Sequence, residues 1–177
     1  DGNDHRTERL ARIDAAGPQD ALAHPTWSMG AKITIDSAGL MNKGLELVEA
    51  HHLFDAPVEK LKVLVHPQSA VHGLVQFRDG SLSAGMAAAD MRVPIAHAMN
   101  HPERPPLETR RLDLAEMRTL EFFAADLDKF PALRLTFEAL AAGGALTTVL
   151  NAANEIAVEA FLSGRIRFGG IARLVAA

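Results

Sequence analysis

Residues 24–46 read HPTWSMGAKITIDSAGLMNKGLE, and they decide the predicted fold. Within them Lys32–Asp36 alternates polar and apolar side chains, which is typical of a half-buried strand. Asp and Ser at the end of this run favour a helix start, because both accept hydrogen bonds from the free backbone amides there. The stretch therefore predicts a strand followed by a helix from about Ser37 to Phe54.

The junction between this strand and this helix carries groups that suit an anion. Free amides at a helix start and the positive end of the helix dipole attract phosphate, and Ser37 adds a hydroxyl beside them. On the same helix Asn42 and Glu46 are i,i+4 neighbours, while Lys43 and Glu46 are i,i+3 neighbours. The junction thus offers phosphate-binding groups and, one turn further on, a carboxylate.

These residues also have plainer interpretations. Ser37 is a residue type common at helix caps. Glu46 either pairs with Lys43 on a solvated face or serves as an oxygen ligand for a hard cation such as Mg²⁺ or Mn²⁺. One carboxylate does not make a metal site, and Asp36 and Glu49 are weak partners on spacing alone.

Composition narrows the class of protein. The 177 residues suit one domain, or one with a small appendage, and the mean hydropathy of +0.04 is ordinary for a soluble globular chain. A net charge of −4 without a basic block argues against nucleic acid as a partner. The absence of cysteine excludes thiolate metal sites, and no apolar run approaches the roughly 20 residues of a membrane helix. We therefore expect a cytoplasmic protein without nucleic-acid or membrane partners.

The rest of the chain predicts an α+β fold. We expect a small mixed sheet of about four strands with one major helix against it, followed by a helical segment. Asn151, Asn154 and Glu155 are polar in an otherwise apolar helical stretch, which predicts local hydrogen bonding across a bundle. The further predicted strands are Leu61–Val65, Val71–Phe77 and Leu82–Met86, with a turn at Arg78–Ser81, and the further helices are Pro94–Met99, Pro131–Ala142 and Thr148–Ser163.

The loop at residues 24–30 carries large side chains without helical or strand periodicity. His24 and Trp27 either anchor the loop in the core or face a ligand, and the second role is the commoner one in a turn-rich loop. Structural hydrogen bonds to the backbone are favoured for His66 and His72, because no second metal ligand stands at a suitable spacing.

Five segments together carry a family resemblance. The chain resembles the 1-deoxy-D-xylulose 5-phosphate reductoisomerases from about residue 18 to residue 174, in the order that the family has. The motifs are long and specific, and they read HPTWSMGAKITIDSAGLMNKGLELVEA, VLVHPQSAVHGLV, DMRVPIAHAM, FPAL and LNAANEIAVEAFL.

The resemblance implies an activity. The family converts 1-deoxy-D-xylulose 5-phosphate to 2-C-methyl-D-erythritol 4-phosphate in the non-mevalonate route to isoprenoids, with NADPH and Mn²⁺ or Mg²⁺. A rearrangement of the carbon skeleton gives an aldehyde, which hydride from NADPH then reduces. A homodimer is the assembly that the family implies.

The resemblance also assigns residues. Ser37, Asn42 and Lys43 match the residues that bind the substrate phosphate. Glu46 matches one of three acidic metal ligands and lies at the substrate. Met91 matches a residue near the nicotinamide.

The segment at residues 21–31 resembles the flap that closes over the substrate. His24 and Trp27 take catalytic roles in this interpretation, and His24 also contacts the substrate. Met29 belongs with Met91 at the cofactor. Closure of such a flap excludes water from a reactive aldehyde.

The chain departs from the family pattern in several places. It lacks the amino-terminal dinucleotide-binding domain, the segment with the other two metal ligands, the expected phosphate loop before residue 6 and the carboxy-terminal helical bundle. Gly39, Ala70 and Gly73 stand where the family usually carries other residues, which predicts a looser core because Gly inside a helix costs about 1 kcal/mol relative to Ala.

We therefore expect a fragment without turnover of its own, with a catalytic domain at residues 1–95 and a truncated helical segment at residues 96–177. Its first residue is not Met, and its last residues form an apolar run. Two other functions stay open. One is a non-catalytic phosphate-binding or dimerisation remnant of the enzyme, and the other is a metal-dependent sugar-phosphate isomerase that does not consume NADPH.

Overall fold

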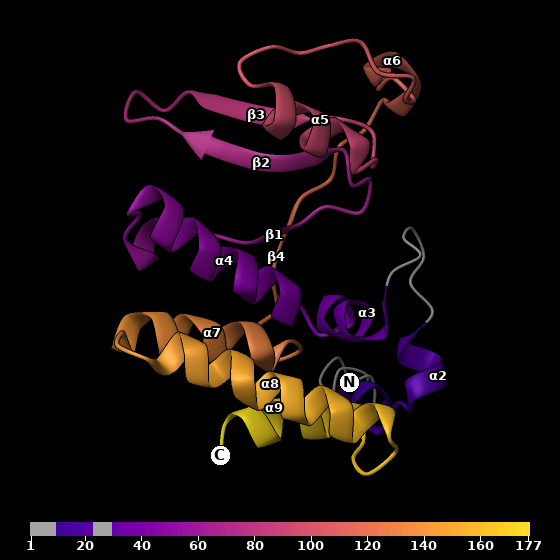
Figure 1. Cartoon of the computed structure of the whole chain (residues 1–177), viewed down its shortest axis with the longest axis vertical. Coiled ribbons are helices and arrows are strands. Elements are labelled where there is room, and N and C mark those ends of the chain that lie inside the picture. The colour runs from indigo at the N-terminus through magenta and orange to yellow at the C-terminus, as the bar shows by residue number, and fades with distance from the viewer. Residues whose placement is uncertain (1–9, 23–29) are drawn as a thin grey trace, which may run out of the picture. The chain divides into compact units, whose positions relative to one another are not determined.

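The computed structural model describes residues 10–22 and 30–177 and divides the chain into two compact units. The first unit combines residues 1–63 with residues 125–177, and the second comprises residues 64–124. The described residues form helices and small antiparallel sheets, joined by turns and loops, which confirms the predicted α+β class (Figure 1). Residue 95, where the sequence predicts a domain boundary, lies in α5 (Arg92–Asn100) of the second unit.

The first unit is helical. Helix α7 contacts both α4 and α8, and α9 packs along α8 (Figure 1). Residues 10–15 of this unit are helical. The elements that follow in the first unit are α2 (Pro18–Ala21), α3 (Ala31–Ala38), α4 (Met41–Phe54), the short 3-10 helix η1 (Val58–Lys60), α7 (Pro131–Ala142), α8 (Leu146–Leu162) and α9 (Phe168–Val175).

Apolar side chains from both halves of the chain form the core of this unit. Ile35 of α3 is buried with Phe161 of α8 and Ile171 of α9. Met41 of α4 packs with Leu150 of α8. The inner faces of α3 and α4 are therefore covered by helices α7, α8 and α9 from the carboxy-terminal part of the chain.

The predicted strand at Lys32–Asp36 is wrong, because these residues form part of helix α3. Two side-chain contacts are specific to the helix: Lys32 Nζ lies 2.8 Å from Asp36 Oδ2, and Thr34 Oγ1 donates to the Gly30 carbonyl at 3.0 Å. Both join residues four apart, which a strand would hold far from each other. An alternating pattern of only five residues is compatible with a strand or with a helix. The helix is stabilised here because it buries Ile35 against α8 and α9.

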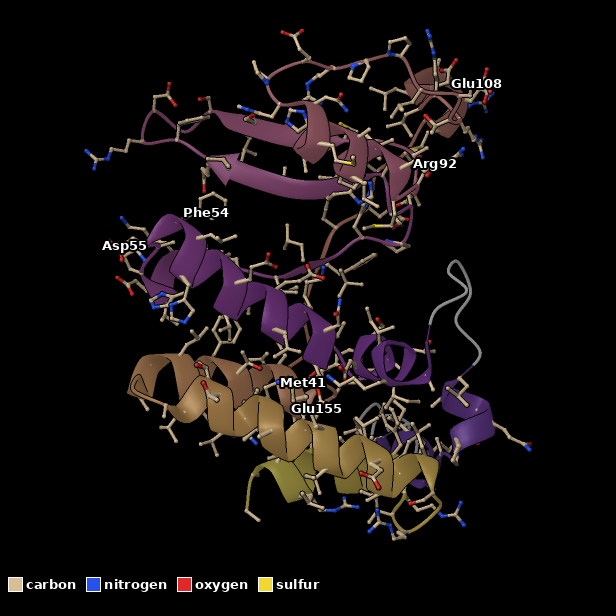
Figure 2. The ribbon with its side chains drawn as sticks, viewed as in Figure 1. Met41, Phe54, Asp55, Arg92, Glu108 and Glu155 are labelled. Carbon is tan, nitrogen blue, oxygen red and sulfur yellow. The ribbon has the colours of Figure 1, made fainter. Side chains whose placement is uncertain are left out.

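The predicted single helix from Ser37 to Phe54 is divided into two. α3 ends at Ala38, and Leu40 adopts the left-handed conformation with φ 58° before α4 begins at Met41. Figure 2 shows Met41 at one end of α4 and Phe54 at the other. Gly39 is the C-cap residue of α3 and not an interior residue, so the predicted loss of stability from a glycine inside a helix does not apply there.

The second unit contains two separate two-stranded sheets in place of the predicted four-stranded mixed sheet. β2 (Val71–Gln76) and β3 (Leu82–Met86) form an antiparallel hairpin with Val71 opposite Met86 and Gln76 opposite Leu82. The predicted turn at Arg78–Ser81 closes it, with Gly80 at φ 87°.

The other sheet is shorter than predicted. β1 holds only Leu64–Val65 of the predicted strand Leu61–Val65, and it pairs antiparallel with β4 (Phe123–Ala124). α5 and α6 (Leu114–Met117) complete the unit. Within residues 10–22 and 30–177, no helix is long and apolar enough to span a membrane.

A close approach of two helices sets the spacing of the first unit. Gly44 of α4 faces Thr136 of α7, and a Cβ added at Gly44 would lie 2.3 Å from the Thr136 hydroxyl oxygen. Thr136 is fully buried, and its Oγ1 donates to the Ala132 carbonyl at 3.0 Å. Only glycine fits at residue 44 with these helices at this separation.

We expect Gly44→Ala to lower the free energy of unfolding by about 1–3 kcal/mol, since the added methyl forces α4 and α7 apart. Urea denaturation measures the change. Thr136→Ala in the same chain should recover part of the loss, because it removes the clashing hydroxyl. Gly73→Ala in β2 is the matched control, as nothing lies within 4 Å of its added Cβ. Strictly additive effects at residues 44 and 136 would contradict the close contact.

Candidate functional site

Helix α4 brings three of the predicted site residues together. The amide nitrogen of Asn42 donates to Glu46 Oε1 at 2.8 Å, and the Lys43 ammonium forms an ion pair with Glu46 Oε2. The Lys43 and Glu46 side chains keep 42% and 46% of their surface exposed, so the cluster is open to a ligand. The spacing that predicted contact of Asn42 and Lys43 with Glu46 is thus confirmed.

Ser37 lies at the end of α3 and not at the start of a helix, so its predicted role as N-cap is wrong. Its carbonyl accepts the backbone N–H of Leu40 at 3.2 Å, in the short connection that leads to α4. The positive helix end that was expected at Ser37 therefore belongs to Met41. No side chain caps this end, and its first turn holds no acidic residue.

Glu46 alone does not make a metal site. The described residues contain no group of three or more His, Asp or Glu side chains that could hold a metal ion. Asp36, one of the two weak partners, is only 3% exposed and already bonded to other side chains. Glu49 is exposed one turn beyond Glu46. Among the described residues, Glu46 therefore has no pair of further side-chain ligands with which to complete a metal site.

Behind α4 lies a polar network that connects α3 to α8. Asn154, which has no exposed surface, donates its Nδ2 to Asp36 Oδ1 at 2.8 Å. Asp36 Oδ2 lies 2.8 Å from Lys32 Nζ, which is also 3.1 Å from Glu155 Oε1. Burial lowers the pKa of Lys32, but the hydrogen bonds and charges of both carboxylates outweigh it and raise that pKa overall. The predicted bonding of Asn154 and Glu155 across the bundle is confirmed.

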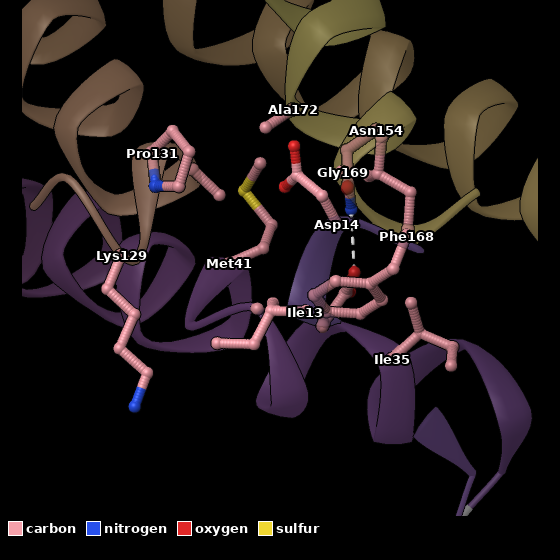
Figure 3. A pocket seen from close by; sticks show the side chains of 14 residues that line it. Ile13, Asp14, Ile35, Met41, Lys129, Pro131, Asn154, Phe168, Gly169 and Ala172 are labelled. Carbon is pink, nitrogen blue, oxygen red and sulfur yellow. Dashed lines mark hydrogen bonds between the residues drawn. The ribbon is translucent and has the colours of Figure 1, made fainter. Parts of the chain in front are cut away.

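A small pocket lies beside this network, with about 40 Å³ open to water (Figure 3). Apolar side chains make most of its wall, among them Met41, Phe168 and Ile35. Asp14 and Asn154 both line it, and Figure 3 shows the hydrogen bond that Asn154 donates to Asp36. Sequence patterns gave no signal for this pocket, because its lining comes from helices far apart along the chain.

Met91 belongs to the second unit and is 58% exposed at the start of α5. Its neighbours hold the segment: Arg92 Nη2 lies 2.6 Å from Asp90 Oδ2, and the Arg92 backbone N–H donates to Asp90 Oδ1 at 2.9 Å. The side-chain hydrogen bonds from Arg92, followed by that backbone bond, hold the pKa of Asp90 below its usual value. The Asp90–Arg92 pair thus fixes the turn that presents Met91.

His66 and His72 in the second unit bond to backbone carbonyls, as predicted. His66 Nδ1 lies 2.8 Å from the Glu121 carbonyl, and its ring stacks on Phe122. His72 Nε2 lies 3.1 Å from the Ala87 carbonyl. The remaining predicted site residues, His24, Trp27 and Met29 of the flap at residues 21–31, lie outside the described residues.

The pair of Lys43 and Glu46 should contribute little to stability, since exposed helix pairs are worth only a few tenths of a kcal/mol. A double-mutant cycle with Lys43→Met and Glu46→Gln, read by urea unfolding, should give a coupling below about 0.5 kcal/mol. Arg134 and Glu138 on α7, at 2.6 Å and similarly exposed, provide the matched control pair. A coupling several times larger at residues 43 and 46 than in the control would show that the cluster has a structural role.

Comparison with known proteins identifies the family. A model described as the DXP reductoisomerase C-terminal domain matches residues 86–177, more than half of the chain. A second model, the 1-deoxy-D-xylulose 5-phosphate reductoisomerase C-terminal domain, matches residues 1–54.

Curated relatives agree with these matches. The 1-deoxy-D-xylulose 5-phosphate reductoisomerase of Bradyrhizobium sp. (strain ORS 278) is 55% identical over 176 residues, which cover 99% of this chain and 43% of that protein. The same enzyme of Chlorobium phaeovibrioides is 53% identical over 174 residues, 98% of this chain and 45% of the relative. The chain thus spans less than half the length of these relatives.

Solved structures of the same enzyme are similar to this chain. The Zymomonas mobilis enzyme in complex with NADPH has a TM-score of 0.87 at 47% identity, over 94% of this chain and 43% of that one. A further reductoisomerase, in complex with NADPH, fosmidomycin and magnesium, has a TM-score of 0.91 at 48% identity, over 95% and 41%. The chain belongs to the 1-deoxy-D-xylulose 5-phosphate reductoisomerase family.

Proposed function

We propose that this chain forms the carboxy-terminal part of an enzyme that converts 1-deoxy-D-xylulose 5-phosphate to 2-C-methyl-D-erythritol 4-phosphate with NADPH and a divalent cation. The observation that carries the proposal is the identity of 53–56% to curated reductoisomerases over nearly the whole chain. Because the chain covers about 43% of their length, turnover requires the remaining residues of a longer protein. We expect no turnover from these residues alone.

The phosphate of the substrate binds at the start of α4 in this proposal. Lys43 supplies a positive charge, Asn42 an amide donor and Ser37 a hydroxyl, and the uncapped positive end of α4 lies between them in the sequence. Glu46 holds the Lys43 and Asn42 side chains in place before substrate arrives. Phosphate then competes with Glu46 for Lys43, which frees the carboxylate.

A freed Glu46 is suited to bind a divalent cation, and magnesium is present in three of the similar structures. Since the described residues complete no metal site, we propose Glu46 only as the contribution of this chain to one. Mg²⁺ or Mn²⁺ takes the remaining ligands from elsewhere in the longer protein.

The other roles follow the family resemblance. Met91, exposed on its fixed turn, packs near the nicotinamide of NADPH together with Met29. His24 and Trp27 close over the substrate as parts of the flap and exclude water from the reactive aldehyde. We also propose a cytoplasmic homodimer, as the family implies.

A chimera tests the proposal directly. The 177 residues would replace their counterpart in the Zymomonas mobilis enzyme, and NADPH oxidation would be followed with 1-deoxy-D-xylulose 5-phosphate and Mg²⁺. We expect turnover that depends on the sugar phosphate. A folded chimera that binds NADPH but shows no turnover would favour the non-catalytic remnant, and product formation without NADPH consumption would favour an isomerase.

Lys43→Met in this chimera should lower kcat/KM for the sugar phosphate by about ten- to a hundredfold. This factor corresponds to the free energy of one lost charge-assisted hydrogen bond. Lys60→Met is the matched control, because Lys60 is an exposed lysine of the same unit in η1. Equal losses in the two variants would refute a phosphate site at Lys43.

Glu46→Gln should raise the Mg²⁺ concentration for half-maximal activity by at least about tenfold, because a carboxylate ligand is lost. Glu49→Gln is the control, as Glu49 is another exposed acid one turn further along α4. The metal assignment fails if both variants require the same Mg²⁺ concentration as the parent chimera.

A further inference from the structure

We propose that the buried hydrogen bond between Asp36 and Asn154 positions the α3–α4 connection and, with it, the residues that bind the sugar phosphate. Asp36 and Asn154 are positioning residues in this proposal, since neither touches the substrate. The inference rests on the proposed function for the identity of the ligand, but the effect on residues 37–46 can be measured without turnover.

The contact has the properties of a specific anchor. It joins residues 118 positions apart at 2.8 Å, and its two side chains are 3% and 0% exposed. Apolar contacts of Ile35 with α8 hold α3 against the bundle, but they tolerate sliding because they have no preferred direction. A buried hydrogen bond with a charged acceptor is directional and costly to leave unmade, so it fixes where α3 lies along α8.

The anchor lies next to the site along the chain. Ser37 follows Asp36 directly, and only Gly39 and Leu40 separate α3 from α4. Leu40 holds a left-handed conformation, with little freedom to absorb a shift of α3. A displacement at Asp36 is therefore passed to the start of α4, where the phosphate-binding side chains stand.

Lys32 and Glu155 extend the anchor to the surface. Lys32 bridges Asp36 and Glu155 at 2.8 and 3.1 Å, and it remains 36% exposed. The bridge neutralises the buried Asp36 charge, which would otherwise be expensive to keep beneath the site. α3 and α8 are thus joined by two linked polar contacts, one buried and one at the edge.

Exchange of the two partners tests the proposal in the chimera described above. Asn154→Asp places two carboxylates against each other, whereas the double variant Asp36→Asn with Asn154→Asp restores a hydrogen bond with donor and acceptor reversed. Asp36→Asn alone keeps an acceptor for Asn154 and reports the loss of the Lys32 ion pair by itself. Phe161→Leu is the control that weakens the apolar contact between α3 and α8 and leaves the hydrogen bond intact, because Phe161 is fully buried with Ile35, two turns further along α8.

Three readouts are compared: the thermal midpoint, hydrogen–deuterium exchange of residues 37–46, and KM for the sugar phosphate and for NADPH. Asn154→Asp should raise the exchange rate of residues 37–46 and KM for the sugar phosphate by about tenfold each. This factor corresponds to the free energy of one lost buried hydrogen bond. KM for NADPH should change less than about twofold, because the residues proposed to contact the cofactor do not include Asp36, Asn154 or residues 37–46. The double variant should return both changed values to within about threefold of the parent, since the bond is restored.

The proposal is overturned if Phe161→Leu, at an equal loss of thermal midpoint, speeds exchange of residues 37–46 as much as Asn154→Asp does. It is also overturned if the double variant recovers the thermal midpoint but not the exchange. A parent chimera without turnover would refute the proposed function, while the exchange experiment would still decide the role of Asp36 and Asn154.

Discussion

The contact between Gly44 of α4 and Thr136 of α7 is the constraint on which the first unit depends. It allows α4 to approach α7 closely, which buries Met41 and Leu47 on one side of the helix and leaves Lys43 and Glu46 exposed on the other. One helix therefore serves both the core and the candidate site. The position of the site is decided by packing on the face opposite to it.

Sequence patterns predicted those parts of the fold that depend on neighbouring residues. Helix α7 and strand β3 have the predicted bounds, because Pro131 suits a helix start and the turn at Gly80 defines the hairpin. The segment Lys32–Asp36 was mistaken for a strand, since five alternating residues fit both structures. Its helical state depends on burial against α8 and α9, which no local pattern contains.

The candidate site shows the same division. Spacing along one helix was enough to predict that Asn42 and Lys43 meet Glu46, and the family resemblance added their roles. The bond between Asp36 and Asn154 could not be derived, because it joins two segments whose separation in the sequence says nothing of their separation in space. The polar Asn154 in an apolar helix was the only local sign of it.

The first unit consists of two stretches of chain with the whole second unit inserted between them, and β1 pairs with β4 close to both joins. A ribosome makes α3 and α4 long before it makes the helices that cover them. During synthesis the apolar face of α4 therefore remains exposed to solvent while the residues of the second unit leave the ribosome and pair their own strands. The nascent chain is most open to aggregation and to chaperones in this interval, which ends when α7, α8 and α9 are complete.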